Sequence, residues 1–116
     1  MTTTITTEDL ANVPDPAGAT YVADWDNPAD PAAGRYFRGT KRVIDRADDP
    51  YKGDLEVKSW GVQAREGDVR RYVDVTEGGY ERLTFSGAVD ARQFGEALIA
   101  AADEVHQMAG RDPGIA

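Results

Sequence analysis

The segment over residues 60–75 constrains the fold most, because its apolar residues alternate with polar ones on both sides of a turn. Alternation with a period of two is typical of strands that turn one face to the core. A Gly67-Asp68 pair between the two halves suits a two-residue type II′ loop, and we therefore expect a hairpin with Glu66 opposite Val69. In that register one face carries the apolar residues Trp60, Val62, Val73 and Val75.

A second hairpin follows, and its last strand must bring Leu83 and Phe85 to the face of Val73 and Val75. A two-residue loop at Gly78-Gly79 would place them on the wrong side. We therefore expect a three-residue loop with a bulge, for which the two glycines supply positive φ.

Upstream of the first hairpin, Leu55 and Val57 have the opposite phase to the apolar residues that follow them. A bulge at Ser59 or Gly61 would reverse the phase and keep all of them on one face.

An amphipathic helix follows the last strand. Its apolar residues recur in alternating steps of three and four, at Ala91, Phe94, Leu98, Ala101, Val105 and Met108. We expect this stripe to face the core, with Ser86 as N-cap and Gly110 as the stop. The predicted fold class is α+β, with an antiparallel sheet of about four to five strands packed on one C-terminal amphipathic helix.

A chain of 116 residues has room for one domain. We expect a flexible N-terminal tail over residues 1–18, a single α+β domain over 19–110 and a C-terminal tail over 111–116. Within the domain, residues 20–25 and 35–44 are further strand candidates.

The net charge and the residue content argue against several kinds of partner and binding site. The net charge is −8, which disfavours nucleic acid and anionic membrane surfaces as general partners. The chain has no cysteine, so it offers neither a disulfide nor a thiolate metal site. It shows no signal peptide and no apolar run long enough to cross a membrane, and we expect a cytoplasmic protein.

No catalytic or metal constellation is apparent. The single histidine, His106, falls beside the helix stripe and is expected on the surface. Carboxylates pair at Asp24/Asp26, Asp48/Asp49 and Asp103/Glu104, without the apolar context that would raise a pKa for acid–base work. Phosphate-loop, dinucleotide and metalloprotease motifs are missing. We therefore expect no enzyme, no cofactor and no metal.

The sheet face turned away from the helix is the best candidate for binding. In the predicted register it carries Arg65, Arg70, Tyr72 and Arg82, with Tyr80 and Gln63 as further members. Arginine and tyrosine are enriched in protein interfaces. The same pairing on an open sheet also binds single-stranded RNA in some domains, and an ordinary solvated face is the third interpretation.

Three runs in the second half of the chain carry a resemblance: LEVKSWGVQAREGDVRRYVDVTEGG, YERLTFSG and ARQFGEALIAAADEV. Together they resemble small uncharacterised proteins of actinobacteria and actinobacteriophages, in which a β-meander leads into an Ala-rich C-terminal helix. The likeness covers about half of the chain and leaves residues 1–50 unmatched. It implies an origin and a fold, but no catalytic residues.

The function expected from these features is that of a non-enzymatic interaction or accessory protein, phage- or prophage-encoded, that binds a host or viral protein in the host cytoplasm. One alternative is a nucleic-acid-linked regulator. It also includes an acidic inhibitor whose carboxylates imitate the phosphates of DNA, although arginines interrupt the row of aspartates in the N-terminal half of the chain. A further alternative is a homodimeric structural protein.

Overall fold

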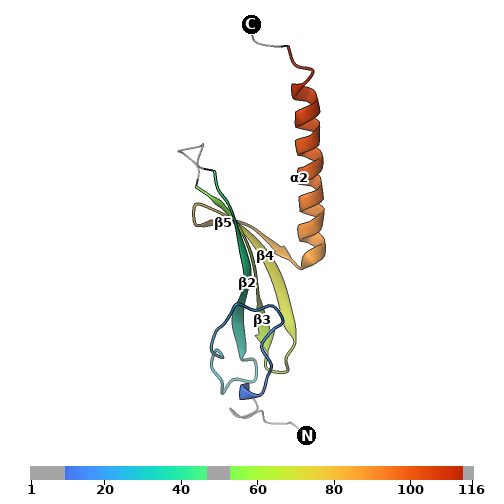
Figure 1. The fold of residues 1–116 in the computed structure, drawn as a ribbon. Coiled ribbons are helices and arrows are strands. Elements are labelled where there is room, and N and C mark those ends of the chain that lie inside the picture. Colours follow the sequence, from blue (N-terminus) through green and yellow to red (C-terminus); the bar gives the residue numbers. More distant parts are fainter. Residues whose placement is uncertain (1–9, 47–52, 114–116) are drawn as a thin grey trace.

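The computed structural model describes residues 10–46 and 53–113. The chain is an α+β protein in which an antiparallel sheet carries one C-terminal helix, as predicted (Figure 1). Its elements are β1 (Tyr21–Val22), β2 (Gly34–Ile44), β3 (Leu55–Ala64), β4 (Val69–Glu77), β5 (Tyr80–Ser86) and α2 (Ala88–Ala109). The five strands follow one another across the sheet in chain order, each antiparallel to the next.

The two faces of the sheet differ in chemistry. The face that we call the core face carries Phe37, Val57, Gly61, Val73, Val75, Leu83 and Phe85. The opposite face, which we call the outer face, carries Tyr36, Arg38, Lys58, Trp60, Val62, Arg70, Tyr72 and Asp74. Residues paired across an antiparallel ladder share a face, so these assignments follow from the register.

The register of the first hairpin corrects the prediction. Gln63 pairs with Val69, and Trp60 pairs with Tyr72 rather than with Val75. The loop has three residues, Arg65 to Gly67, because the Gly67 amide bonds to the Ala64 carbonyl at 2.9 Å and Gly67 takes a φ of 98°. A type I turn that ends in a glycine of positive φ makes this hairpin. The odd shift moves Trp60 and Val62 to the outer face.

The second hairpin brings Leu83 and Phe85 to the predicted face, but with a different loop. Leu83 lies opposite Val75 and Phe85 opposite Val73, as parity requires. The loop is nevertheless the two-residue Gly78-Gly79 turn, with φ of 57° and 87°. The extra residue sits in β5, where the ladder shifts between Val75 and Thr76 and a bulge restores the phase.

The predicted bulge in β3 is wrong, because β3 pairs with β4 without interruption from Leu55 to Gln63. A shift occurs instead between Arg38 and Lys41 of β2, opposite Ser59. A Cβ on Gly39 would collide with the Ser59 hydroxyl, so glycine permits this close approach.

Residues 10–18 lie against the core face at the end of the sheet that holds the β3–β4 hairpin. The side chain of Leu10 is 2 % exposed and that of Phe37 is 1 % exposed. Three side chains of the core face bind backbone carbonyls of this segment: Arg35 those of Val13 and Pro14, Gln63 that of Pro14, and Arg71 that of Ala17. For these residues the structure differs from the expected loose tail. Residues 1–9 of that tail, and residues 114–116 of the C-terminal one, lie outside the described residues.

The helix packs on the sheet near its beginning. The rings of Phe85 and Phe94 lie 5.0 Å apart, and the α2 contacts with the sheet involve β4 and β5. The helix is capped at Gly87 with no side-chain cap, so the Ser86 N-cap was predicted wrongly, whereas Gly110 follows its last residue as predicted. Beyond its base α2 diverges from the strands and projects past them (Figure 1).

The expected burial of the helix stripe is therefore wrong over most of its length. No residue of α2 is buried, and Leu98, Val105 and Met108 are 56 %, 67 % and 42 % exposed. The fold class is as predicted, yet the chain extends 78 × 28 × 19 Å instead of closing the helix down on the sheet.

Candidate interaction surface

A row of aromatic side chains crosses the outer face of the sheet. The Trp60 ring stacks on Tyr72 at 4.6 Å with an interplanar angle of 24°, and lies 5.8 Å from Tyr36. Trp60 is directly opposite Tyr72 in the β3–β4 ladder and diagonal to Tyr36 in the β2–β3 ladder. Cross-strand neighbours of this kind are within reach of large rings. The register thus builds a continuous aromatic strip on three adjacent strands.

Two arginines border this strip. Arg38 of β2 lies over the rings of Tyr21 and Tyr36, with its guanidinium carbon 4.9 Å and 5.8 Å from the ring centres. Arg70 of β4 is exposed on the same face and two residues from Tyr72. Within the described ranges 10–46 and 53–113, neither guanidinium is paired with a carboxylate. The strip is therefore flanked by positive charge that a partner can neutralise.

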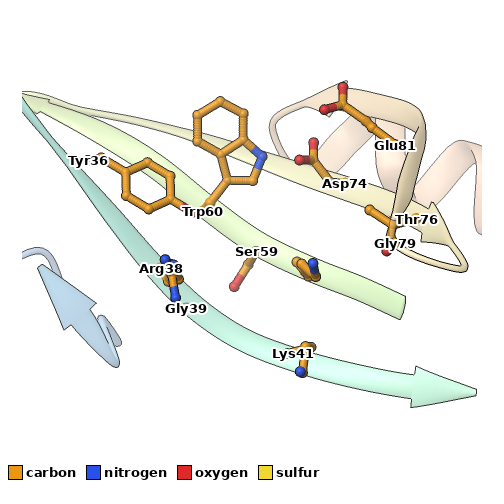
Figure 2. Close-up of a pocket in the computed structure, with 11 residues that line it drawn as sticks. Tyr36, Arg38, Gly39, Lys41, Ser59, Trp60, Asp74, Thr76, Gly79 and Glu81 are labelled. Atoms are coloured by element: carbon orange, nitrogen blue, oxygen red, sulfur yellow. The ribbon is translucent and has the colours of Figure 1, made fainter. Parts of the chain in front are cut away.

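A hollow of about 470 Å³ lies beside the strip. Its lining includes Tyr36, Arg38, Lys41, Lys58, Trp60, Asp74 and Glu81, several of which are drawn in Figure 2. Trp60 Nε1 and Asp74 Oδ1 are shielded from water and have no hydrogen-bond partner among the described residues. Because these two atoms are covered, the hollow presents ring surfaces and charged side chains to a partner.

A small cluster of charged side chains lies beside the hollow, and its two lysines line it. Glu56 lies 3.0 Å from Lys58 Nζ and 3.8 Å from Lys41 Nζ, and its Oε2 accepts a hydrogen bond from the Thr76 hydroxyl. The hydrogen bond from Lys58 lowers the pKa of Glu56 below its usual value of 4.5, against an opposing effect of burial, and the charges of both lysines act in the same sense as that bond. Glu56 thus offsets one of the two lysine charges, whereas Arg38 and Arg70 have no carboxylate partner among the described residues.

The structure brings together only part of the predicted face. Arg70 and Tyr72 lie on it, whereas Arg65 is 5 % exposed in the hairpin loop and its Nη1 donates to the carbonyl of Asp30. Gln63 is buried on the core face, and Tyr80 lies opposite Glu77. Position 82 forms the β5 bulge, and the side chain of Arg82 lies outside the described residues.

Sequence reasoning missed three members of the surface: Tyr36, Arg38 and Trp60. It placed Trp60 on the core face because a two-residue Gly67-Asp68 loop puts Trp60 opposite Val75, and it did not pair β2 with β3. The Arg65-Glu66-Gly67 loop was the available signal, because a glycine in its third position favours a three-residue loop and thereby the register that exposes Trp60.

Among residues 10–46 and 53–113, the remaining titratable groups form no further cluster. His106 is exposed on α2, as predicted, and Asp103 and Glu104 are exposed beside it. Asp24 and Asp26 are also exposed, whereas Asp48 and Asp49 lie outside the described residues. Among the residues that the structure describes, no three His, Cys, Asp or Glu side chains gather as a metal site would require. In the same residues no helix is long and apolar enough to cross a membrane.

Comparison with known protein families, with curated proteins and with solved structures finds no match for this chain.

Proposed function

We propose that this chain is a non-enzymatic binding protein that recognises another protein through the outer face of its sheet. The observation that carries the proposal is the stacked strip of Tyr36, Trp60 and Tyr72, bordered by Arg38 and Arg70 without ion pairs. Aromatic residues and arginine dominate the energetically important centres of protein interfaces. A row of rings on three strands offers such a centre.

The chemistry of the strip specifies the kind of partner. The rings offer apolar area, and the two arginines favour a carboxylate at the rim. The partner we propose is therefore a protein segment that presents an apolar side chain next to an acidic one. A cytoplasmic setting and an actinobacterial or phage origin belong to this proposal, on the strength of the resemblance in residues 55–105.

Affinity capture from an actinobacterial lysate tests the proposal, with wild type compared with Tyr72→Ala and Arg70→Ala. We expect a partner that the wild type retains and that each variant binds about tenfold more weakly, or about 1.4 kcal/mol. Arg92→Ala is the matched control, because Arg92 is exposed on α2. Identical partner profiles for wild type and both face variants would remove the outer face as the binding surface.

The isolated pair then allows a direct measurement. The chain has two tryptophans, so Trp25→Phe leaves Trp60 as the only indole. Burial of the strip by the partner shifts the emission of Trp60 to shorter wavelength. An emission spectrum unchanged at saturating partner would place the contact elsewhere.

A single-stranded nucleic acid is the second candidate partner, favoured by rings with basic neighbours on an open sheet. The net charge of −8 opposes it. Fluorescence anisotropy with labelled single- and double-stranded oligonucleotides at low salt separates the two, since low salt strengthens phosphate contacts. Binding that Arg38→Ala weakens would support a nucleic-acid-linked regulator, and no binding under those conditions excludes it.

A further inference from the structure

Among the residues that the structure describes, none covers the apolar stripe of α2 over most of its length. Phe94 contacts Phe85, but Leu98, Val105 and Met108 stand in solvent beyond the sheet. Most of the stability of helices in proteins comes from packing of an apolar face, and α2 makes few such contacts along its 22 residues. An exposed stripe of large apolar residues on such a helix indicates an interaction surface.

The spacing of the stripe is that of a coiled-coil seam. Steps of three and four residues repeat from position 91 to position 108, which gives the a and d positions of a heptad in the order Ala91, Phe94, Leu98, Ala101, Val105, Met108. A seam of this kind is covered by a second helix that lies along it with knobs-into-holes packing. The surface is separate from the outer face of the sheet.

The seam is complementary to itself when reversed. An antiparallel copy aligned at its middle pairs Leu98 with Ala101, and the flanking layers join Phe94 to Val105 and Ala91 to Met108. Every layer then combines a larger and a smaller side chain, so the helices stay at an even distance. A parallel copy would stack Phe94 on Phe94 and Ala101 on Ala101, with alternating bulges and voids.

The residues beside the seam favour the same arrangement. One flank repeats small residues every seven positions, at Ala88, Gly95, Ala102 and Ala109, which allows the helices to approach closely. The other flank carries Asp90 at the start of the helix and Arg111 just after its end. In the antiparallel pair Asp90 of one copy faces Arg111 of the other at both ends of the seam, whereas a parallel pair leaves both charges without partners.

The seam, its flank of small residues and the Asp90 and Arg111 charges agree on one occupant, a second copy of this chain. We propose that the chain forms a homodimer in which α2 pairs antiparallel with α2 of a second copy along the seam from Ala91 to Met108.

Sedimentation equilibrium of the full chain at several concentrations tests the dimer. We expect twice the chain mass of 12.6 kDa for wild type and the single mass for Leu98→Glu. Ile99→Glu is the matched control, because Ile99 is the next residue, is 65 % exposed and lies off the seam. It introduces the same charge and should remain dimeric. A monomeric wild type, or equal dissociation of both variants, would overturn the proposal.

Disulfide trapping tests the direction of the helices, since the chain has no cysteine of its own. We expect a mixture of Ala91→Cys and Met108→Cys chains to form a disulfide-linked heterodimer under mild oxidation, and neither chain alone to do so. A disulfide dimer of Ala91→Cys alone would show parallel helices and contradict the arrangement. The absence of any cross-link in a sample that sediments as a dimer would place the contact away from the seam.

Discussion

Gly61 lies at a position of the core face where there is no room for a side chain. The ring of Phe37 lies over it, and a Cβ at this position would be 2.5 Å from Phe37 Cζ and closer still to the carbonyl oxygen of Arg70. The obstacle includes backbone as well as a buried ring, so neither can move aside freely. Glycine is thus required here by packing and not by its backbone angles.

We expect Gly61→Ala to lower the free energy of unfolding by about 1–3 kcal/mol, the usual cost of overpacking a filled site. Urea unfolding at fixed protein concentration measures it. Gly34→Ala is the comparison, because its added Cβ would meet one backbone oxygen, that of Gln63, at 3.2 Å, and it should cost less than Gly61→Ala. Equal stability of wild type and Gly61→Ala would contradict the packing of Phe37 on β3.

Glu56 gives the sheet a dependence on pH. Its pKa is lowered, first by the hydrogen bond from Lys58, so the folded state favours the ionised carboxylate. The stabilisation is complete above the usual value of 4.5 and disappears as the pH falls through the lower pKa of the folded state. We expect Glu56→Gln to be less stable than wild type at about pH 7 and equal to it at about pH 3. A stability difference that stays constant over this range would exclude the linkage.

The loop of the β3–β4 hairpin depends on one glycine. Gly67 takes a φ of 98° and has no atom within 4 Å of an added Cβ, so a substitution there costs conformational strain without steric conflict. We expect Gly67→Ala to lower the free energy of unfolding by about 1–2 kcal/mol, and Gly67→Asn by less. The urea midpoints of the three chains decide this. Equal midpoints for Ala and Asn would argue against a positive φ at this position.

Local patterns predicted the strands of this sheet better than their register. The alternation of Val69, Val73 and Val75 identified β4. The prediction that Leu83 and Phe85 share a face with Val73 and Val75 is confirmed. The three-residue loop was assigned to the wrong hairpin, because Gly67-Asp68 and Gly78-Gly79 both offer glycine for a tight turn. One such choice moved Trp60 across the sheet, and with it the centre of the candidate surface. A turn type cannot be decided from a glycine pair alone when each option satisfies one local rule.

The helix shows a different limit of sequence reasoning. A stripe in steps of three and four identified α2 and its end at Gly110. An apolar stripe alone does not predict which surface covers it, because the chain's own sheet and a second helix can bury leucine and valine equally well. The strict seven-residue spacing, which suits a helix more than a sheet, was the signal for the second reading.

At the scale of the whole molecule, residues 10–18 are part of the folded unit. Leu10 is buried against the core face, and the carbonyls of Val13, Pro14 and Ala17 accept hydrogen bonds from arginine and glutamine side chains of the sheet. We expect Leu10→Ala to lower the free energy of unfolding by about 2–5 kcal/mol, as for other buried leucines. Ala11→Gly, at an exposed neighbour, is the control. An unchanged urea midpoint for Leu10→Ala would show that the segment is not anchored.

The shape of the chain joins these observations. The Cα radius of gyration is 20.6 Å, against about 13 Å for a compact domain of this length, because α2 projects from the sheet and leaves its stripe uncovered. We infer that a second molecule, and not the chain's own sheet, covers this stripe.

Small-angle scattering over a dilution series measures both properties, since forward scattering gives the mass and the low-angle slope gives the radius of gyration. We expect a mass of two chains at high concentration, and on dilution a monomer whose radius of gyration stays near 20 Å. A monomer at every concentration, with a radius of gyration of about 13 Å, would show instead that the helix folds down onto its own sheet.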